Sequence, residues 1–273
     1  MVDGGVIERA LEVWPHALEA ACARCRVFRQ VRVIRETAST QDAALQLGAP
    51  VGSLVTAGRQ VGGRGRLGAA WADTVQDGVA CTFVVEPTSA ERLAMTAAVA
   101  VVQAARACVP SDQADRLGLK WPNDLQAAWP DGGRRKVAGV LVEIRDGRAL
   151  VGIGVNVRQE AFPGPLAHKA ASLHMLGGTH DRLHTIERLL EAMDQALAMD
   201  VTALEDRYRR FDRTLGQRMR FVTPAGEVEG EVLRCDPARG LEVQGPSGPV
   251  WLPAATTRVH VDGPSDRSTL HGP

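Results

Sequence analysis

Residues 58–71 read Gly58-Arg59-Gln60-Val61-Gly62-Gly63-Arg64-Gly65-Arg66-Leu67-Gly68-Ala69-Ala70-Trp71. Five glycines and three arginines fall within the first eleven of these residues. Glycines let backbone N–H groups approach a ligand closely and form an anion-binding nest. Arginine side chains pair with carboxylate or phosphate through two parallel hydrogen bonds. We therefore expect a loop that holds a ligand with several negative charges.

Two other interpretations of this stretch are weaker. Gly63-x-Gly65-x-x-Gly68 has the spacing of a dinucleotide-binding fingerprint, and a strand-like run, Ser53–Ala57, precedes it. That motif requires a helix to begin at its last glycine, but residues 69–78 show no apolar period. A plain surface loop would leave the arginines unexplained. A P-loop is excluded because no Gly-Lys-Ser/Thr follows.

Composition narrows the class of protein. The chain has 273 residues, 45% of them apolar, and 32 basic residues balance 32 acidic ones. Zero net charge argues against bulk nucleic-acid binding and favours a locally charged site. No apolar run reaches the roughly 18 residues of a membrane span, and the N-terminus lacks signal-peptide features. Five scattered cysteines suggest reduced thiols and a cytoplasmic protein.

Periodicity and turn signals predict the elements around the glycine–arginine stretch. Helices broken at Pro15 precede a strand at 31–34, and Ser39 with Asp42 fits a helix-capping signal. Strands are expected at 53–57 and 79–86, a helix at 89–109, and a turn holding Asn123 and Asp124 after Pro122. Two β-rich runs, 136–144 and 149–157, flank Asp146-Gly147, which is the strongest hairpin signal in the chain.

The second half of the chain has a different residue pattern from the first half. Residues 160–184 are loop-like, and 185–211 form an amphipathic helix or a pair of helices. From residue 216, short β-like runs predict a small all-β unit. We expect a helical N-terminal extension at 1–30, a catalytic domain at 31–213, a small β-domain at 214–260 and a disordered tail at 261–273.

Several smaller features allow two interpretations. Cys22 and Cys25 form a CxxC, more plausibly incidental helix cysteines than a zinc or redox pair. His180 and His184 lie one helical turn apart, but no HExxH accompanies them, so metal binding is the weaker interpretation. Bare backbone at alternating glycines 152 and 154 indicates either close approach of a ligand or a β-bulge.

Four motifs in order carry a resemblance to a known family. They are the glycine–arginine stretch, Lys120-Trp121-Pro122-Asn123-Asp124, Lys136-Val137-Ala138-Gly139-Val140-Leu141-Val142-Glu143, and Gly152-Ile153-Gly154-Val155-Asn156. With Ser39-Thr40 ahead of them, they resemble biotin–protein ligases, over about residues 31 to 260. The resemblance looks closest to the monofunctional class, which has no DNA-binding domain. It implies an α+β fold, with a mixed β-sheet catalytic domain flanked by helices and a small C-terminal SH3-like β-barrel.

The resemblance also implies a reaction. The biotin carboxylate attacks the α-phosphate of ATP to give biotinyl-5′-AMP and pyrophosphate, and a carrier lysine then takes the biotin and releases AMP. The implied catalytic residues are Lys136, Asp124 and Arg66. The implied biotin-binding residues are Ser39, Thr40, Gln60, Gly63, Arg64, Lys136, Gly152 and Gly154. The implied ATP-binding residues are Arg64, Arg66, Trp71, Lys120, Asn123 and Asn156, with Asp124 near magnesium.

Further expectations concern partners and individual side chains. The implied partner is the biotin carrier domain of acetyl-CoA carboxylase or a related carboxylase, with no nucleic acid and no membrane. A sheet edge could dock the carrier or pair two subunits. Asp124 is also the candidate for orienting the incoming lysine ammonium. Trp71 and Trp121 either cover the adenine or pack in the core.

The chain departs from the family pattern at two positions. Ala69 stands where the usual loop has arginine, and Gln41 stands where the family has asparagine. We therefore expect a working ligase that retains its intermediate less tightly. Two alternatives stay open: a binding protein that holds biotin or biotinyl-AMP without transfer, and a lipoate or octanoate ligase or transferase on the same fold.

Overall fold

A computed structural model of the protein describes residues 9–71, 77–236 and 239–259. The chain divides into two compact units, Met1–Arg213 and Thr214–Pro273. The first unit is built on a seven-stranded sheet with the order β1-β2-β5-β9-β8-β7-β6. Its strands are β1 (Gln30–Thr37), β2 (Ser53–Gln60), β5 (Gly78–Val85), β6 (Leu117–Lys120), β7 (Asp124–Ala128), β8 (Arg134–Arg145) and β9 (Arg148–Asn156).

The sheet is mixed. Strands β1 and β2 are parallel because helix α2 (Thr40–Gln46) connects them, and the remaining neighbours are antiparallel. The predicted hairpin is confirmed as β8 and β9, joined at Asp146 (φ 51°) and Gly147 (φ 70°). Two positive φ angles are what a tight hairpin turn requires, so local chemistry fixes this register.

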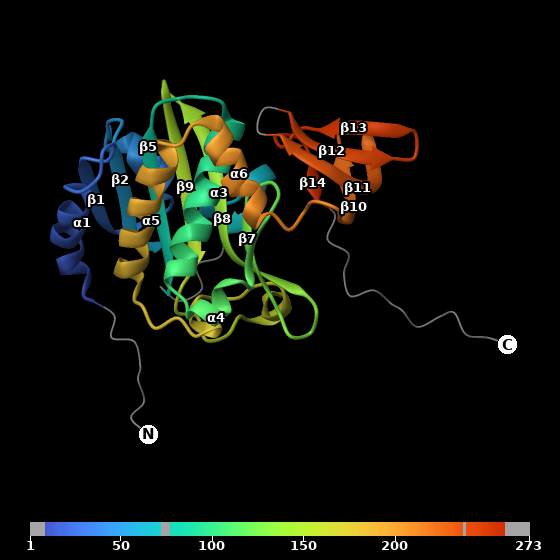
Figure 1. Ribbon diagram of the computed structural model, residues 1–273. Helices are drawn as coiled ribbons and strands as arrows, with labels where there is room; N and C mark the ends of the chain where they lie inside the picture. The colour runs from blue at the N-terminus through green and yellow to red at the C-terminus, as the bar shows by residue number, and fades with distance from the viewer. Residues whose placement is uncertain (1–8, 72–76, 237–238, 260–273) are drawn as a thin grey trace. The chain divides into compact units, whose positions relative to one another are not determined.

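Helices cover the sheet. Helices α3 (Ala90–Ala107) and α5 (Arg182–Leu197) lie side by side against it, with α6 (Val201–Phe211) nearby (Figure 1). Helix α2 packs on strands β2, β5 and β9 through a core of small and branched apolar side chains. This core comprises Ala43, Ala44, Ala49, Val55, Val84 and Leu150. Side chains alternate along a strand, so Phe83 points away from α2, and its ring meets Phe28 at 5.0 Å.

The remaining helical segments of this unit are short. They are η1 (Leu11–Val13), α1 (Trp14–Cys22), α4 (Ser111–Ala114), η3 (Gly164–His168) and η4 (His174–Leu176). Within the described ranges, no helix is long and apolar enough to cross a membrane.

The second unit is a five-stranded antiparallel sheet with the order β13-β12-β11-β10-β14. Its strands are β10 (Arg218–Thr223), β11 (Gly226–Asp236), β12 (Gly240–Gly245), β13 (Gly248–Leu252) and β14 (Arg258–Val259). The predicted small all-β unit is confirmed. Strand β14 was not predicted, because a strand of two residues is too short to show alternating hydrophobicity. The predicted disordered tail lies outside the described residues.

Three local predictions were wrong, and a fourth was confirmed only in part. Pro15 does not break a helix but sits in the first turn of α1, where its missing N–H costs nothing. The predicted start of a helix after Ser39 is confirmed as α2, but the Ser39 side chain makes no capping hydrogen bond. Asp124 is not in a turn but begins β7, a strand of five residues that is too short for its period to be recognised. Helix α5 begins at Arg182 rather than Thr185, because Asp181 accepts a capping hydrogen bond from the His184 N–H.

Candidate active site

The glycine–arginine stretch is a short hairpin rather than an irregular loop. Strands β3 (Gly63–Arg64) and β4 (Ala70–Trp71) pair, with the 3-10 turn η2 (Arg66–Gly68) between them. A Cβ atom on Gly63 would lie 2.6 Å from Gln60 Nε2 and 2.9 Å from the Trp71 carbonyl oxygen. Only glycine fits there, so Gly63 lets the hairpin close against β2.

Trp71 lies on the bare backbone of two central strands. A Cβ atom on Gly154 of β9 would be 2.5 Å from Trp71 Cε2, and one on Gly139 of β8 would be 3.2 Å from Cζ3. The pairing of β9 with β5 and with β8 runs without a register shift, so the bulge interpretation of Gly152 and Gly154 is wrong. The glycines make a floor on which a flat group can rest, and the indole rests there in this structure.

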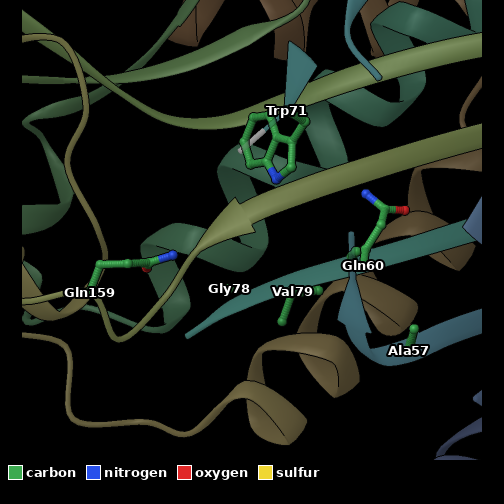
Figure 2. A pocket seen from close by; sticks show the side chains of 7 residues that line it. Ala57, Gln60, Trp71, Gly78, Val79 and Gln159 are labelled. Carbon is green, nitrogen blue, oxygen red and sulfur yellow. The ribbon is translucent and has the colours of Figure 1, made fainter. Parts of the chain in front are cut away.

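A small pocket continues from this floor. Its lining residues are Ala57, Gln60, Trp71, Gly78, Val79, Ala80 and Gln159, and Figure 2 shows Trp71 over it and the two glutamines on opposite sides. Its volume of about 10 Å³ is the room of a single water molecule. Gln159 is 2% exposed, and its Oε1 has no hydrogen-bond partner among the described residues. Sequence reasoning missed Gln159, because a single glutamine after a strand carries no local signal.

Buried hydroxyls connect the pocket to helix α2. Gln60 Oε1 accepts hydrogen bonds from the Thr40 N–H (2.9 Å) and the Thr40 hydroxyl (3.3 Å), and the Thr82 hydroxyl donates to Thr40 Oγ1 (2.9 Å). Ser39 is also buried. The structure thus brings the predicted Ser39, Thr40 and Gln60 together and adds Thr82. A threonine inside the apolar run 79–85 was the available signal for this residue.

Gln41 fills the space above Gly152, the first glycine of β9. Its Nε2 donates to the carbonyl oxygens of Leu141 (3.3 Å) and Leu150 (3.2 Å). A Cβ atom on Gly152 would lie 2.9 Å from the Gln41 side chain. Gly152 therefore accommodates Gln41, which anchors the first turn of α2 to β8 and β9.

Lysine and aspartate side chains meet at the junction of β6, β7 and β8. Lys136 Nζ lies 2.6 Å from Asp124 Oδ1, and Lys120 is the register partner of Asp124. Burial lowers the pKa of Lys120; Asp124 offsets part of this effect, and Lys136 adds to it. Lys136 Nζ is also 5.3 Å from the centre of the Trp71 ring. Two cations and one carboxylate thus lie beside the glycine floor.

The two predicted asparagines hold backbone. Asn123 Nδ2 donates to the Val140 carbonyl oxygen at 2.7 Å. Asn156 Nδ2 donates to the carbonyl oxygens of Lys136 (3.3 Å) and Ala171 (3.0 Å). Their amides therefore fix the strand from which Lys136 projects. Their side-chain oxygens are the groups left to meet a ligand.

An ion cluster lies where the hairpin meets the sheet. The Arg64 guanidinium contacts Asp42 through two nitrogens, at 2.5 and 2.9 Å, and Arg145 Nη1 approaches Asp42 Oδ1 at 3.0 Å. Glu143 Oε2 lies 3.5 Å from Arg64 and 3.6 Å from Arg145. These contacts lower the pKa of Asp42, with the Arg64 hydrogen bonds as the largest cause. Arg66 is half-buried in η2. No motif or periodicity marked Arg145 beforehand.

The cysteine pair, the histidine pair and Trp121 have the following surroundings in the structure. Burial raises the pKa of Cys22 to about 11 and of Cys25 to about 12, so both thiols stay protonated. The rings of His180 and His184 stack at 4.0 Å. Among the residues with described positions, no group of three His, Cys, Asp or Glu side chains could hold a metal ion. Trp121 is buried, with 4% of its surface exposed.

A family model and two characterised relatives match this chain. Residues 31–160 match the model of the biotin/lipoate A/B protein ligase family. The chain is 32% identical over 213 residues to the biotin–[acetyl-CoA-carboxylase] ligase of Mycobacterium tuberculosis, covering 73% of this chain and 77% of that protein. It is 30% identical over 220 residues to the bifunctional ligase/repressor BirA of Bacillus spizizenii, covering 75% of this chain and 65% of that one. The chain thus spans about two-thirds of the length of this bifunctional relative.

Solved structures give the same fold. The biotin protein ligase of Aquifex aeolicus, solved in complex with biotin and ATP, superimposes with a TM-score of 0.74 at 23% identity. The match covers 86% of this chain and 100% of that one. At this identity the likeness establishes the fold, and the chemistry has to be argued from the residues of this chain.

Proposed function

The chain belongs to the biotin/lipoate A/B protein ligase family, and on that premise we propose that it is an ATP-dependent biotin–protein ligase. It would join biotin to AMP and then pass biotin to a lysine of a biotin carrier domain. The observation that carries the proposal is the Lys136–Asp124 pair at 2.6 Å, set beside a glycine floor that accepts a flat ring. This arrangement puts a cation and a base at one end of an apolar slot, by which we mean the glycine floor together with the small pocket that continues from it.

The first step brings two anions together. A carboxylate oxygen of biotin forms a bond to the α-phosphorus of ATP, and the bond to pyrophosphate breaks. Fixed positive charge has to be in place where negative charge gathers, and such preorganised electrostatics supply most of the rate. We assign this role to Lys136, with Lys120 beside it. Arg66 of the hairpin would close over the phosphates.

The second step needs a neutral amine. The carrier lysine nitrogen attacks the carbonyl carbon of the mixed anhydride, the amide bond forms and AMP leaves. An ammonium ion has no lone pair, so its proton has to be removed first. Asp124 is the carboxylate at this point, and its contact with Lys136 orients it for that transfer.

The slot would hold biotin by hydrogen bonds at one end and stacking in the middle. Thr40, Gln60 and Ser39 offer polar groups to the ureido head, and Gln159 offers a buried oxygen without a partner among the described residues. Gly154 and Trp71 would bracket the apolar ring and chain, while Gly63, Arg64 and Gly152 shape the walls. Trp71, Asn123 and Asn156 would border the nucleotide. The indole has to move, because the present volume of about 10 Å³ admits no biotin.

Magnesium fits this site only in part. Asp124 supplies one carboxylate, and the described residues offer no cluster of three ligating side chains. Mg²⁺ is commonly held by one or two carboxylates together with the phosphates of its nucleotide, so Asp124 is the residue that would hold it. A bound magnesium would neutralise phosphate charge.

We extend the proposal to partners and context. Strand β1 is at an edge of the sheet, where a carrier strand or a second copy of the chain could add by backbone pairing. The five-stranded second unit is proposed to be an SH3-like barrel. The odd number of cysteines favours the reducing cytoplasm as the site of the reaction.

Mass spectrometry of a biotin carrier domain tests the proposal. The carrier is incubated with the protein, ATP and magnesium, together with biotin, lipoate or octanoate in parallel. We expect one biotin mass on one lysine and no change with the other acids. A shift with lipoate or octanoate alone would overturn the substrate. Biotin binding without any shift would indicate a protein that holds biotin without transfer.

Ala69 tests how tightly the hairpin retains the intermediate. Ala69 is exposed, and its carbonyl oxygen accepts a hydrogen bond from the Gly65 N–H across the turn. Ala69→Arg adds a guanidinium within reach of the phosphates, so we expect free adenylate to escape about threefold to tenfold more slowly. Ala69→Gln is the control for side-chain length. Equal release from wild type and Ala69→Arg would count against a leaky hairpin.

A further inference from the structure

The hairpin that carries Trp71 is tied to the body of the catalytic unit by charge. Arg64 projects from β3, Asp42 from the first turn of α2, and Glu143 and Arg145 from β8. Arg64 and Asp42 meet as a fork with contacts at 2.5 and 2.9 Å. Such planar, two-bond pairs are the strongest and most directional ion pairs in proteins.

The pair does not stand alone. Arg145 approaches the same Asp42 at 3.0 Å, so the carboxylate is held from two sides. Glu143 Oε2 lies between the two guanidinium groups at 3.5 and 3.6 Å, buried and without a hydrogen bond among the described residues. Networks hold geometry better than isolated surface pairs do. The hairpin is therefore fixed at Arg64 to two elements that themselves form the site.

We propose that Asp42, supported by Arg145, is a positioning residue that latches the glycine–arginine hairpin over the active site through Arg64. The inference rests on the proposed ligase function for what the latch retains, but not for its existence. Asp42 sits two residues after Thr40 in helix α2, and Thr40 hydrogen-bonds Gln60 of the pocket, so the latch and the pocket share this helix. Opening the hairpin requires Arg64 to leave Asp42, and release of the adenylate follows opening.

The chain offers a matched control for removing this carboxylate. Glu36 of β1 pairs with Arg59 of β2 at 3.0 Å, close to where the hairpin begins, and both groups are exposed. Asp42→Asn and Glu36→Gln each replace one carboxylate by an amide of the same shape. Neither variant removes an arginine, so both retain the trypsin sites of the hairpin.

Trypsin tests the latch without any ligand or activity. We expect the ligand-free Asp42→Asn protein to be cut after Arg64 or Arg66 about five to ten times faster than wild type, and Arg145→Gln to show a smaller increase in the same direction. Glu36→Gln should match wild type. Equal cutting of Asp42→Asn and wild type would overturn the latch, whatever the activity of the protein.

Adenylate release then tests the consequence. Preformed biotinyl-AMP should leave Asp42→Asn about fivefold faster than wild type. Release from wild type should quicken between about 0.05 and 0.5 M salt, because half-exposed pairs are screened, while release from Asp42→Asn should not. A merely structural role would not remove the salt dependence, so an unchanged salt response would contradict the proposal. Failure of wild type to make adenylate would refute the ligase function while the trypsin result still decides the latch.

Discussion

Lys136→Ala is expected to lower the rate of adenylate formation by about 100-fold to 1000-fold, the range seen when one preorganised charge or donor is removed from a transition state. Lys136 Nζ is the cation nearest Asp124, at 2.6 Å, and it borders the glycine floor. Removing it leaves Asp124 with only Lys120 nearby. Two negative partners then approach each other without the charge that offsets their repulsion.

The fold should survive this change. The Lys136 N–H donates to the Lys169 carbonyl oxygen, and the Lys136 carbonyl oxygen accepts from the Ala171 N–H. These backbone bonds do not involve the side chain, which is partly exposed. We therefore expect the melting temperature to change little while adenylate formation slows.

Lys169→Ala is the matched control, since it removes the same charge from a neighbouring exposed lysine. Mass spectrometry of biotinyl-AMP in a single turnover, together with calorimetric biotin binding, gives the two measurements. Near-normal adenylate formation by Lys136→Ala would refute the assigned role. Loss of both binding and folding would show that the variant cannot test it, and Lys136→Gln would replace it, with the same loss of chemistry expected.

Local chemistry made the central hairpin predictable. Asp146 and Gly147 both take positive φ, and the runs on either side of them are rich in valine, isoleucine and leucine. Gly152 and Gly154 were marked as unusual by sequence alone, because glycine inside a strand indicates close approach of another group or a bulge. What fills the space over a glycine was not readable, because Trp71 and Gln41 arrive from other elements.

Pairings between distant residues could not be derived from the residues alone. Asp124 reaches Lys136 because β7 pairs with β8 through a register shift between Leu125 and Gln126, and a bulge leaves no pattern in the sequence. Asp42 appeared to be a capping residue, yet it pairs with Arg64 and Arg145. Each of these contacts needs the tertiary fold to be known first.

Gly154→Val is expected to weaken biotin binding by about 100-fold, because overpacking a tight contact costs several kcal/mol at most and a factor of 100 is about 2.7 kcal/mol. A Cβ atom at residue 154 would stand 2.5 Å from Trp71 Cε2. Valine suits a strand, so β9 should still form. The methyl groups would rise into the layer that the indole now occupies and that the ligand ring is proposed to share.

Three further variants separate the causes of this loss. Ile153→Val, on the next residue of β9 and pointing to the opposite face, should keep biotin affinity while lowering stability by about 1 kcal/mol. Gly154→Ala combined with Trp71→Ala should bind better than Gly154→Ala alone if the clash lies between the new methyl group and the indole. Calorimetry on all four proteins reports these differences directly. Wild-type affinity in Gly154→Val would mean that biotin does not lie on this strand, because no ligand could rest on the glycine floor with a valine standing in it.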